Sequence, residues 1–291
     1  MFIPLAGAFY LNAIASNFVL VYYLTSTLMR KGMVSVIGKA FIGLWKKEWA
    51  LMKVYYFVVL IVGLVFAIGV SGSLQEARLF MITGVVLVLH MFILAALVIY
   101  SLNREADQLQ LFLHNPQSAA ILVGVKFLQS LLFMVVSMTI FGLITVLTAK
   151  QWVVLTFGEL FLVVVIATMF IIGQALLLAV LLLFLWVIHQ VLKTYLGGLS
   201  IVISIILFVA ITGITSTIRS SAFYEQIVGW GYININIESV SSDLLSVFGV
   251  TVHGGMPGGI PVVLGEIVAW VLAITVLYIL SIVLMDRKVE V

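Results

Sequence analysis

The sequence contains no cysteine and few charged residues. Among its 291 residues the absence of cysteine excludes disulfides, thiol catalysis and Cys-based metal sites. Charged residues make up 9% of the chain and hydrophobic residues 64%. A soluble domain has about 25% charged and roughly 45–50% apolar residues. The composition therefore predicts an integral membrane protein.

Motifs of several enzyme classes are also missing. The chain has no GxxxxGK[ST] phosphate loop, no HExxH, no GxSxG and no carboxylate pair at helical spacing within an apolar run. The four histidines, His90, His114, His189 and His253, are scattered, which argues against a histidine metal site. We therefore predict that the chain is not an enzyme. We expect no catalytic residue, no metal or cofactor of its own and no nucleic-acid partner.

Long uncharged runs recur along the chain. Their length suits membrane-spanning helices, whereas an outer-membrane barrel would show short segments of alternating hydrophobicity. The predicted fold class is an all-α polytopic membrane protein with an interfacial elbow helix and six core transmembrane helices. The expected spans are 54–70, 79–102, 120–148, 153–188, 196–218 and 262–285.

The first 33 residues contain a further apolar run, at 5–29, which is followed by Arg30 and Lys31. A secretory signal carries its positive charge before the apolar core, and here the charge comes after. We expect 1–33 to be an extra N-terminal transmembrane segment with its N-terminus outside. The alternatives are a re-entrant or surface segment, or a start codon assigned upstream of the true translation start.

Residues 38–53 alternate apolar and basic side chains at helical spacing. Such a pattern favours a helix that lies in the headgroup region, with tryptophans at the interface and lysines among the phosphates. We predict this segment to be a separate elbow helix. Its apolar face carries Phe41, Leu44, Trp45, Trp49 and Met52, and the opposite face carries Lys46, Lys47 and Lys53.

The lysine and arginine distribution predicts the orientation. Placing 102–126 and the C-terminus in the cytoplasm puts 11 of the 14 basic residues on that side (14 − 3 = 11). The other three, Arg78, Lys150 and Arg219, fall outside. We therefore expect a multi-pass protein of the cell membrane, with the loop 217–261 facing out.

The loop 102–126 reads LNREADQLQLFLHNPQSAAILVGVK and is an amphipathic, charged interruption between two long apolar runs. Acidic residues come first, an apolar turn follows, and Asn115 before Pro116 is biased away from helix. Such a segment predicts a short surface helix that contacts a partner, with an amphipathic loop on lipid headgroups as the alternative. The residues expected to make the contact are Glu105, Asp107, Leu111, Phe112, Leu113, Pro116, Ser118 and Lys126.

Polar residues inside the spans are candidates for a gate or transport pathway. His90 and Gln174 fall within the expected spans, and Trp230 and Tyr232 lie in the outer loop. The alternative for His90 and Gln174 is a hydrogen bond between helices, and for 217–261 it is a flexible outer loop. Because no second mid-depth acid or base is evident, an ion-coupled carrier is disfavoured.

Residues 34–291 resemble the permeases of ABC-2 type transporters. In that family an acidic residue follows the second core span, then comes a segment like LLSLP-S, and a lysine opens the third span. The matching features here are Glu105, the segment LFLHNPQS at 111–118, and Lys126 in KFLQSLLF. The elbow helix and a long outer loop before the last span also match. His114, Asn115 and the extra N-terminal segment depart from the family pattern.

The resemblance implies a permease subunit of an ATP-binding cassette exporter. It implies a homo- or heterodimer of permease chains and two copies of a separate ATPase subunit, which would bind ATP and Mg²⁺. The loop 102–126 would couple the two, and short re-entrant helices in 217–261 would close the outer gate. The apolar run 153–188 suggests a hydrophobic or amphipathic cargo. Alternatives are an ion-coupled secondary transporter, an intramembrane enzyme and a non-transporting sensor or assembly subunit.

Overall fold

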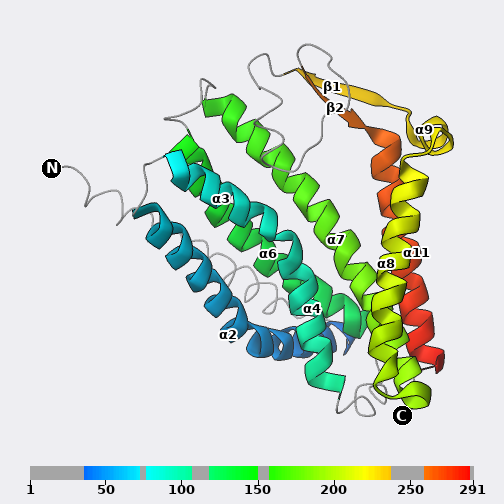
Figure 1. The fold of residues 1–291 in the computed structure, drawn as a ribbon. Coiled ribbons are helices and arrows are strands. Elements are labelled where there is room, and N and C mark those ends of the chain that lie inside the picture. Colours follow the sequence, from blue (N-terminus) through cyan, green and yellow to red (C-terminus); the bar gives the residue numbers. More distant parts are fainter. Residues whose placement is uncertain (1–35, 73–76, 107–117, 150–156, 237–258, 289–291) are drawn as a thin grey trace. The chain divides into compact units, whose positions relative to one another are not determined.

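The computed structural model describes residues 36–72, 77–106, 118–149, 157–236 and 259–288 (Figure 1). By its internal contacts the chain divides into two units, Met1–Lys46 and Lys47–Val291. Each unit is described by itself below. The predicted segment 1–33 lies outside the described residues.

Helices make up most of the described chain. They are α2 (Val36–Gly72), α3 (Ala77–Leu89), α4 (Met91–Ala106), α6 (Ala119–Ala149), α7 (Phe157–Leu196), α8 (Leu199–Arg219), α9 (Ala222–Val228) and α11 (Leu264–Lys288). Two short strands, β1 (Tyr232–Asn236) and β2 (Gly259–Val263), complete the described elements.

Six stretches of helix in the described chain are long and apolar enough to cross a membrane. This finding confirms the prediction of a helical, multi-pass membrane protein. The stretches are Phe41–Ala67, Ile82–Ala106, Ala119–Thr148, Leu160–Leu196, Leu199–Arg219 and Leu264–Asp286.

The first of these stretches differs from the expected division into an elbow helix and a span. Helix α2 runs without interruption from Val36 to Gly72, so helical backbone continues through the expected boundary near residue 53. The boundary between the two units, after Lys46, also falls within α2. A separate elbow helix therefore stays a prediction.

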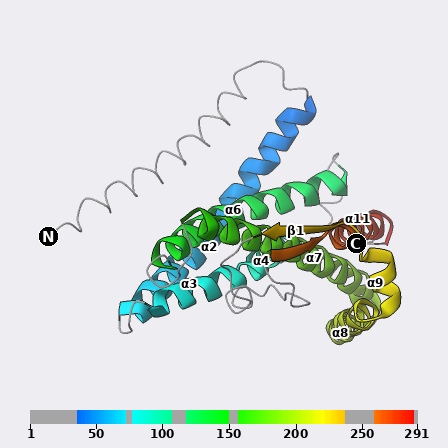
Figure 2. The same ribbon diagram turned by 90° about the horizontal axis from the view of Figure 1, so that it is seen from above.

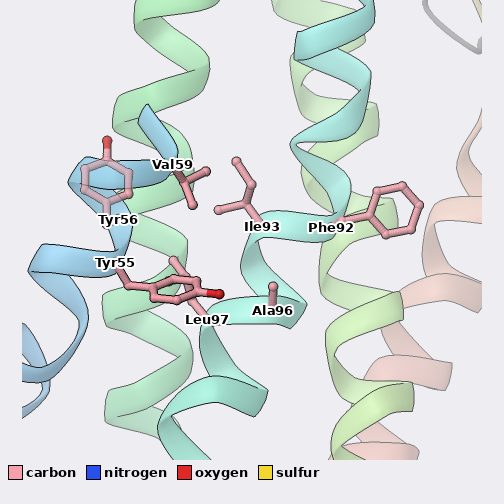
Figure 3. Close-up of a pocket in the computed structure, with 7 residues that line it drawn as sticks. All are labelled: Tyr55, Tyr56, Val59, Phe92, Ile93, Ala96 and Leu97. Carbon is pink, nitrogen blue, oxygen red and sulfur yellow. The ribbon is translucent and has the colours of Figure 1, made fainter. Parts of the chain in front are cut away.

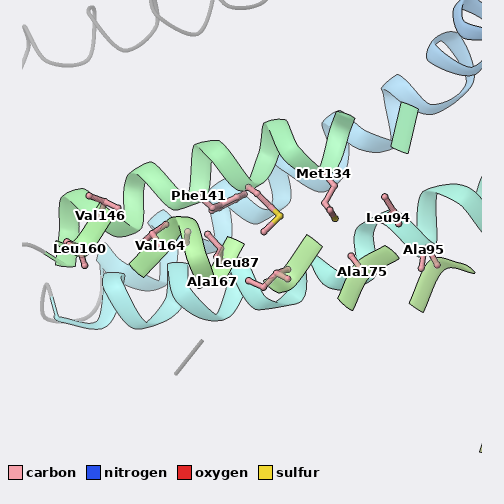
Figure 4. Close-up of a cluster of buried hydrophobic side chains, with 14 residues drawn as sticks. Leu87, Leu94, Ala95, Met134, Phe141, Val146, Leu160, Val164, Ala167 and Ala175 are labelled. Carbon is pink, nitrogen blue, oxygen red and sulfur yellow. The ribbon is translucent and has the colours of Figure 1, made fainter. Parts of the chain in front are cut away.

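The core of the second unit is formed by α3, α4, α6 and α7. Figure 4 shows fourteen buried side chains, Ala67 from α2 and the others from these four helices, among them Leu87, Met134 and Phe141. Small residues let the helices approach closely. A Cβ on Gly63 of α2 would come within 3.1 Å of the Phe141 ring, so α2 reaches this core through a glycine.

Helix α8 lies at the edge of this unit beside α7 (Figure 2). Ser200 is its one buried residue among those described, and large apolar side chains project from it in most directions. Exposed apolar side chains also line α2 and α11. A water-soluble protein rarely exposes so much contiguous apolar surface, whereas lipid tails cover such faces in a bilayer.

The predicted outer loop 217–261, called the outer segment below, contributes to a small antiparallel sheet that the sequence did not predict. Strand β1 pairs with β2, with Tyr232 opposite Val263 and Asn236 opposite Gly259. Helix α9 precedes β1, and the Ser221 side chain caps it by accepting a 3.2 Å hydrogen bond from the Tyr224 amide. Strand β2 leads directly into α11.

Candidate functional site

A buried cluster of charged groups joins α2, α4 and α6. Lys126 Nζ of α6 donates a 2.6 Å hydrogen bond to Glu48 Oε1 of α2 and another to Ser101 Oγ of α4. Ser101 in turn donates a 2.6 Å hydrogen bond to Glu48 Oε2, so hydrogen bonds join all three side chains to one another. Glu105 Oε2 lies 2.7 Å from Lys126 Nζ, and Glu105 also pairs with Lys47. We call these five residues the ion cluster.

The ion cluster is almost fully removed from solvent. Lys126 is 1% exposed and Glu48 is 3% exposed, whereas the Lys47 side chain, at 55%, forms the open edge. An unpaired charge at such a position would be strongly unfavourable. Here two carboxylates face two ammonium groups, so the formal charge is balanced. The cluster can therefore act as a rigid joint between three helices.

Helical spacing explains how Glu48 becomes buried beside three lysines. Glu48 lies four residues before Met52, so both side chains occupy one face of α2. Met52 and Tyr56 pack with Leu97 and Phe133 in a small apolar cluster. This apolar layer lies one turn further along the same face of α2 than Glu48.

Trp49, from the predicted elbow helix, adds to this layer. Its ring lies 4.9 Å from the Phe133 ring of α6, and the Tyr56 ring stacks on Phe133 at 4.3 Å. Lys47, also from the predicted elbow, belongs to the ion cluster. Within the first unit, Trp45 stacks on Phe41 at 6.2 Å and Lys46 is exposed.

The ion cluster lies at both ends of the predicted coupling loop. Glu105, near the start of the loop 102–126, is in the last turn of α4, and Lys126, the last residue of the loop, is two turns into α6. Ser118 is exposed, and its carbonyl accepts hydrogen bonds from the amides of Ile121 and Leu122 at the start of α6. Five predicted contact residues lie outside the described residues: Asp107, Leu111, Phe112, Leu113 and Pro116.

Lys126 was predicted as the residue that bounds the loop and opens the third span. It lies within α6 and is buried between three helices. Glu48 and Ser101 were missed altogether. The sequence did contain one signal for Glu48. At helical spacing this residue falls on the apolar face of 38–53, whereas Lys46 and Lys47 fall on the opposite face.

His90 marks a break in the second predicted span. It separates α3 from α4, and its Nδ1 lies 2.6 Å from the Val86 carbonyl, to which it donates. This bond satisfies a carbonyl oxygen that the broken helix would leave without its usual amide partner. The other ring nitrogen, Nε2, is buried with no hydrogen-bond partner among the described residues. The Phe141 ring lies edge-on at 5.2 Å.

The remaining gate candidates are spread over separate elements. Gln174 is half-buried in α7, and Trp230 and Tyr232 are exposed at the start of the outer segment. A polar residue that was not among the predicted candidates is more deeply buried. Gln129 of α6 is fully buried, and neither its amide oxygen nor its nitrogen has a partner in the described structure.

Arg219 and Glu266 form an ion pair between the end of α8 and the start of α11. The Arg219 guanidinium also lies over the Trp270 ring, 5.7 Å from its centroid. Nearby, Gly231 has a φ of +75°, and its carbonyl accepts a 3.2 Å hydrogen bond from the Leu264 amide. These contacts connect the C-terminal end of α8 to the N-terminal end of α11.

Comparisons of the chain with protein-family models, with curated proteins and with solved structures give no match.

Proposed function

We propose that this chain is the permease subunit of an ATP-binding cassette exporter of the ABC-2 type. The resemblance of 34–291 to that family supplies the class. The observation that supports it best is the ion cluster, which ties together the two ends of the predicted coupling loop. Glu105 lies near the start of the loop, Lys126 is its last residue, and the two form an ion pair.

A permease without its own nucleotide site must receive movement from a separate ATPase through a stiff contact. In the proposed mechanism the ATPase binds the segment around 109–118, with Leu111, Phe112 and Leu113 as the apolar anchor. Movement of that segment then pulls on α4 and α6 together, because Lys126 bridges Glu48 and Glu105. Helix α2 follows through Glu48. Breaking such a buried pair costs about 3–5 kcal/mol, which favours rigid-body motion over separation of the helices.

The proposed assembly contains two permease chains, identical or different, and two ATPase subunits that bind ATP and Mg²⁺. It lies in the cell membrane with the loop and the C-terminus in the cytoplasm and the N-terminus outside. The basic residues support this orientation, with 11 of 14 on the cytoplasmic side. A hydrophobic or amphipathic cargo fits the apolar helices.

Co-purification tests the proposal. The full chain is expressed with its partner ATPase, the complex is isolated, and ATP hydrolysis is measured in lipid. We expect Leu111→Asp with Phe112→Asp to abolish association and the stimulation of hydrolysis. The matched control, Leu143→Asn with Leu147→Asn, changes two exposed apolar residues in α6 far from the loop. Unchanged stimulation in the loop variant would contradict the coupling role.

An ion-coupled secondary transporter is the second candidate, because the cluster brings carboxylates and a lysine into a buried site. The charge balance within the cluster weighs against it, since each carboxylate already has an ammonium partner. Transport driven by a proton gradient with no ATPase present would favour this candidate. If the chain is a non-transporting sensor or assembly subunit, neither ATP nor a proton gradient should drive transport.

A further inference from the structure

A small apolar groove opens on the surface between α2 and α4. Figure 3 shows its seven lining residues, with the Tyr55 ring reaching from α2 toward α4: Tyr55, Tyr56, Val59, Phe92, Ile93, Ala96 and Leu97. Its volume is about 130 Å³, which suits a segment of one hydrocarbon chain and not a complete lipid. Tyr55, Val59 and Phe92 are exposed, so the groove is open to the surroundings of the helices.

The groove continues along α4 to a cation. Phe92, Ala96, Tyr100 and Arg104 follow one another at intervals of four residues, so they share one face of the helix. Tyr55 stacks on Tyr100 with ring centroids 4.5 Å apart. The aromatic lining therefore extends from the groove to the last turn of α4, where Arg104 lies.

Arg104 is held in place on this aromatic surface. Its guanidinium lies over the Tyr100 ring, 5.4 Å from the centroid, and its Nε donates a 3.3 Å hydrogen bond to the Tyr100 hydroxyl. Cation–π contact and this hydrogen bond restrict the side chain. Arg104 is exposed and, unlike Lys47, Lys126 and Arg219, has no ion pair with a described residue.

The depth of the two features matches the two parts of a phospholipid. Arg104 lies at the end of the apolar stretch Ile82–Ala106, where a spanning helix reaches the headgroups. The groove lies two to three turns further into the same stretch, at the level of the acyl chains. A guanidinium binds a phosphate group with two parallel hydrogen bonds and is the preferred side chain for that geometry.

We propose that this site binds one anionic phospholipid, with an acyl chain in the groove and the phosphate on Arg104. A zwitterionic lipid would present the same phosphate together with a positive group, which Arg104 repels. The site therefore selects anionic headgroups. The inference requires only that the helices lie in a bilayer, and it does not depend on ATP-driven transport.

Electron spin resonance of the full chain in phosphatidylcholine vesicles tests the site. Trace amounts of chain-labelled phosphatidylglycerol or chain-labelled phosphatidylcholine are added, and the motionally restricted fraction of each is measured. We expect the wild-type chain to prefer phosphatidylglycerol. Arg104→Gln should reduce that preference about fivefold, which is the usual contribution of one basic residue at a lipid surface.

Two further variants separate the parts of the proposal. Lys193→Gln removes an exposed cation from the last turn of α7 and should leave the preference unchanged. Ala96→Phe fills the groove and should lower the restricted fraction of both lipids. The proposal would be overturned if Lys193→Gln reduced the preference for phosphatidylglycerol as much as Arg104→Gln. It would also be overturned if Arg104→Gln left that preference unchanged, or if Ala96→Phe left the restricted fractions unchanged. Folding of each variant is checked by its thermal unfolding midpoint.

Discussion

Lys126 Nζ and Glu48 Oε1 lie 2.6 Å apart although 78 residues separate them in the chain. This pair ties the first described span to the third, at the end of the predicted coupling loop and two turns into α6. A buried pair contributes little net stability when intact, but removing one partner exposes the cost of burying the other. The pair therefore determines which helices must move together.

Lys126→Met should destabilise the chain by about 3–5 kcal/mol, because Glu48 and Glu105 are then left with no buried ammonium between them. Unfolding in detergent, followed by circular dichroism against denaturant, measures the loss. Adding Glu48→Gln to Lys126→Met should recover part of it. Strict additivity of the two single changes would show that the residues do not interact.

Lys47→Gln provides the matched contrast. Lys47 pairs with the same Glu105, but its side chain is 55% exposed, and exposed pairs contribute about 0–1 kcal/mol. We expect a change within that range in the same unfolding assay, decreasing further in high salt. A loss of stability as large as that of Lys126→Met would show that Lys47 is shielded from solvent in the folded protein.

His90→Leu should destabilise the junction of α3 and α4 by about 1–3 kcal/mol, because the Val86 carbonyl loses its buried donor. Hydrogen exchange of the amides around the junction should rise together with the loss in unfolding free energy. His90→Asn, which keeps a short side-chain donor, is the control and should lose less. Equal effects of both variants would show that the ring packing on Phe141, and not the hydrogen bond, matters.

Gly231→Ala tests the outer segment. The backbone of Gly231 is in the left-handed region at a φ of +75°, and a Cβ would lie 2.9 Å from Cβ of Leu264. The left-handed conformation alone costs a non-glycine residue about 1–2 kcal/mol, and the contact adds to it. Gly213→Ala, in the open middle of α8, should be neutral or stabilising. Thermal unfolding of the two variants gives the comparison.

The spans were predictable because length and hydropathy alone determine them. The expected range 120–148 and the observed helix Ala119–Ala149 nearly coincide. The break at His90 was not predictable, since the sequence LVLHMF contains neither proline nor glycine to mark it. The β1–β2 pair was missed for a related reason. Its two strands are joined by a long stretch, so no local hairpin signal exists.

The candidate site was predictable only in part. Glu105 and Lys126 were selected for their place around the loop, and both belong to the ion cluster. Their partner Glu48 was hidden among lysines, and Ser101 inside an apolar run carries no charge signal. Which groups meet in a buried cluster depends on the packing of α2, α4 and α6. That packing depends on contacts between residues far apart in the chain, which could not be predicted from the single sequence.

Helix α8 has a consequence for mutational experiments. Its apolar side chains contact few atoms of this chain, and none of its most apolar window is buried. Exchanges such as Ile205→Val or Val209→Leu should therefore leave the unfolding of the isolated chain unchanged, since no cavity is created and no neighbour is crowded. Conservative substitutions along this helix should therefore have nearly the same small effect on the unfolding of the monomer. Any position where such an exchange impairs the protein in cells would report a contact made by α8 beyond its own chain.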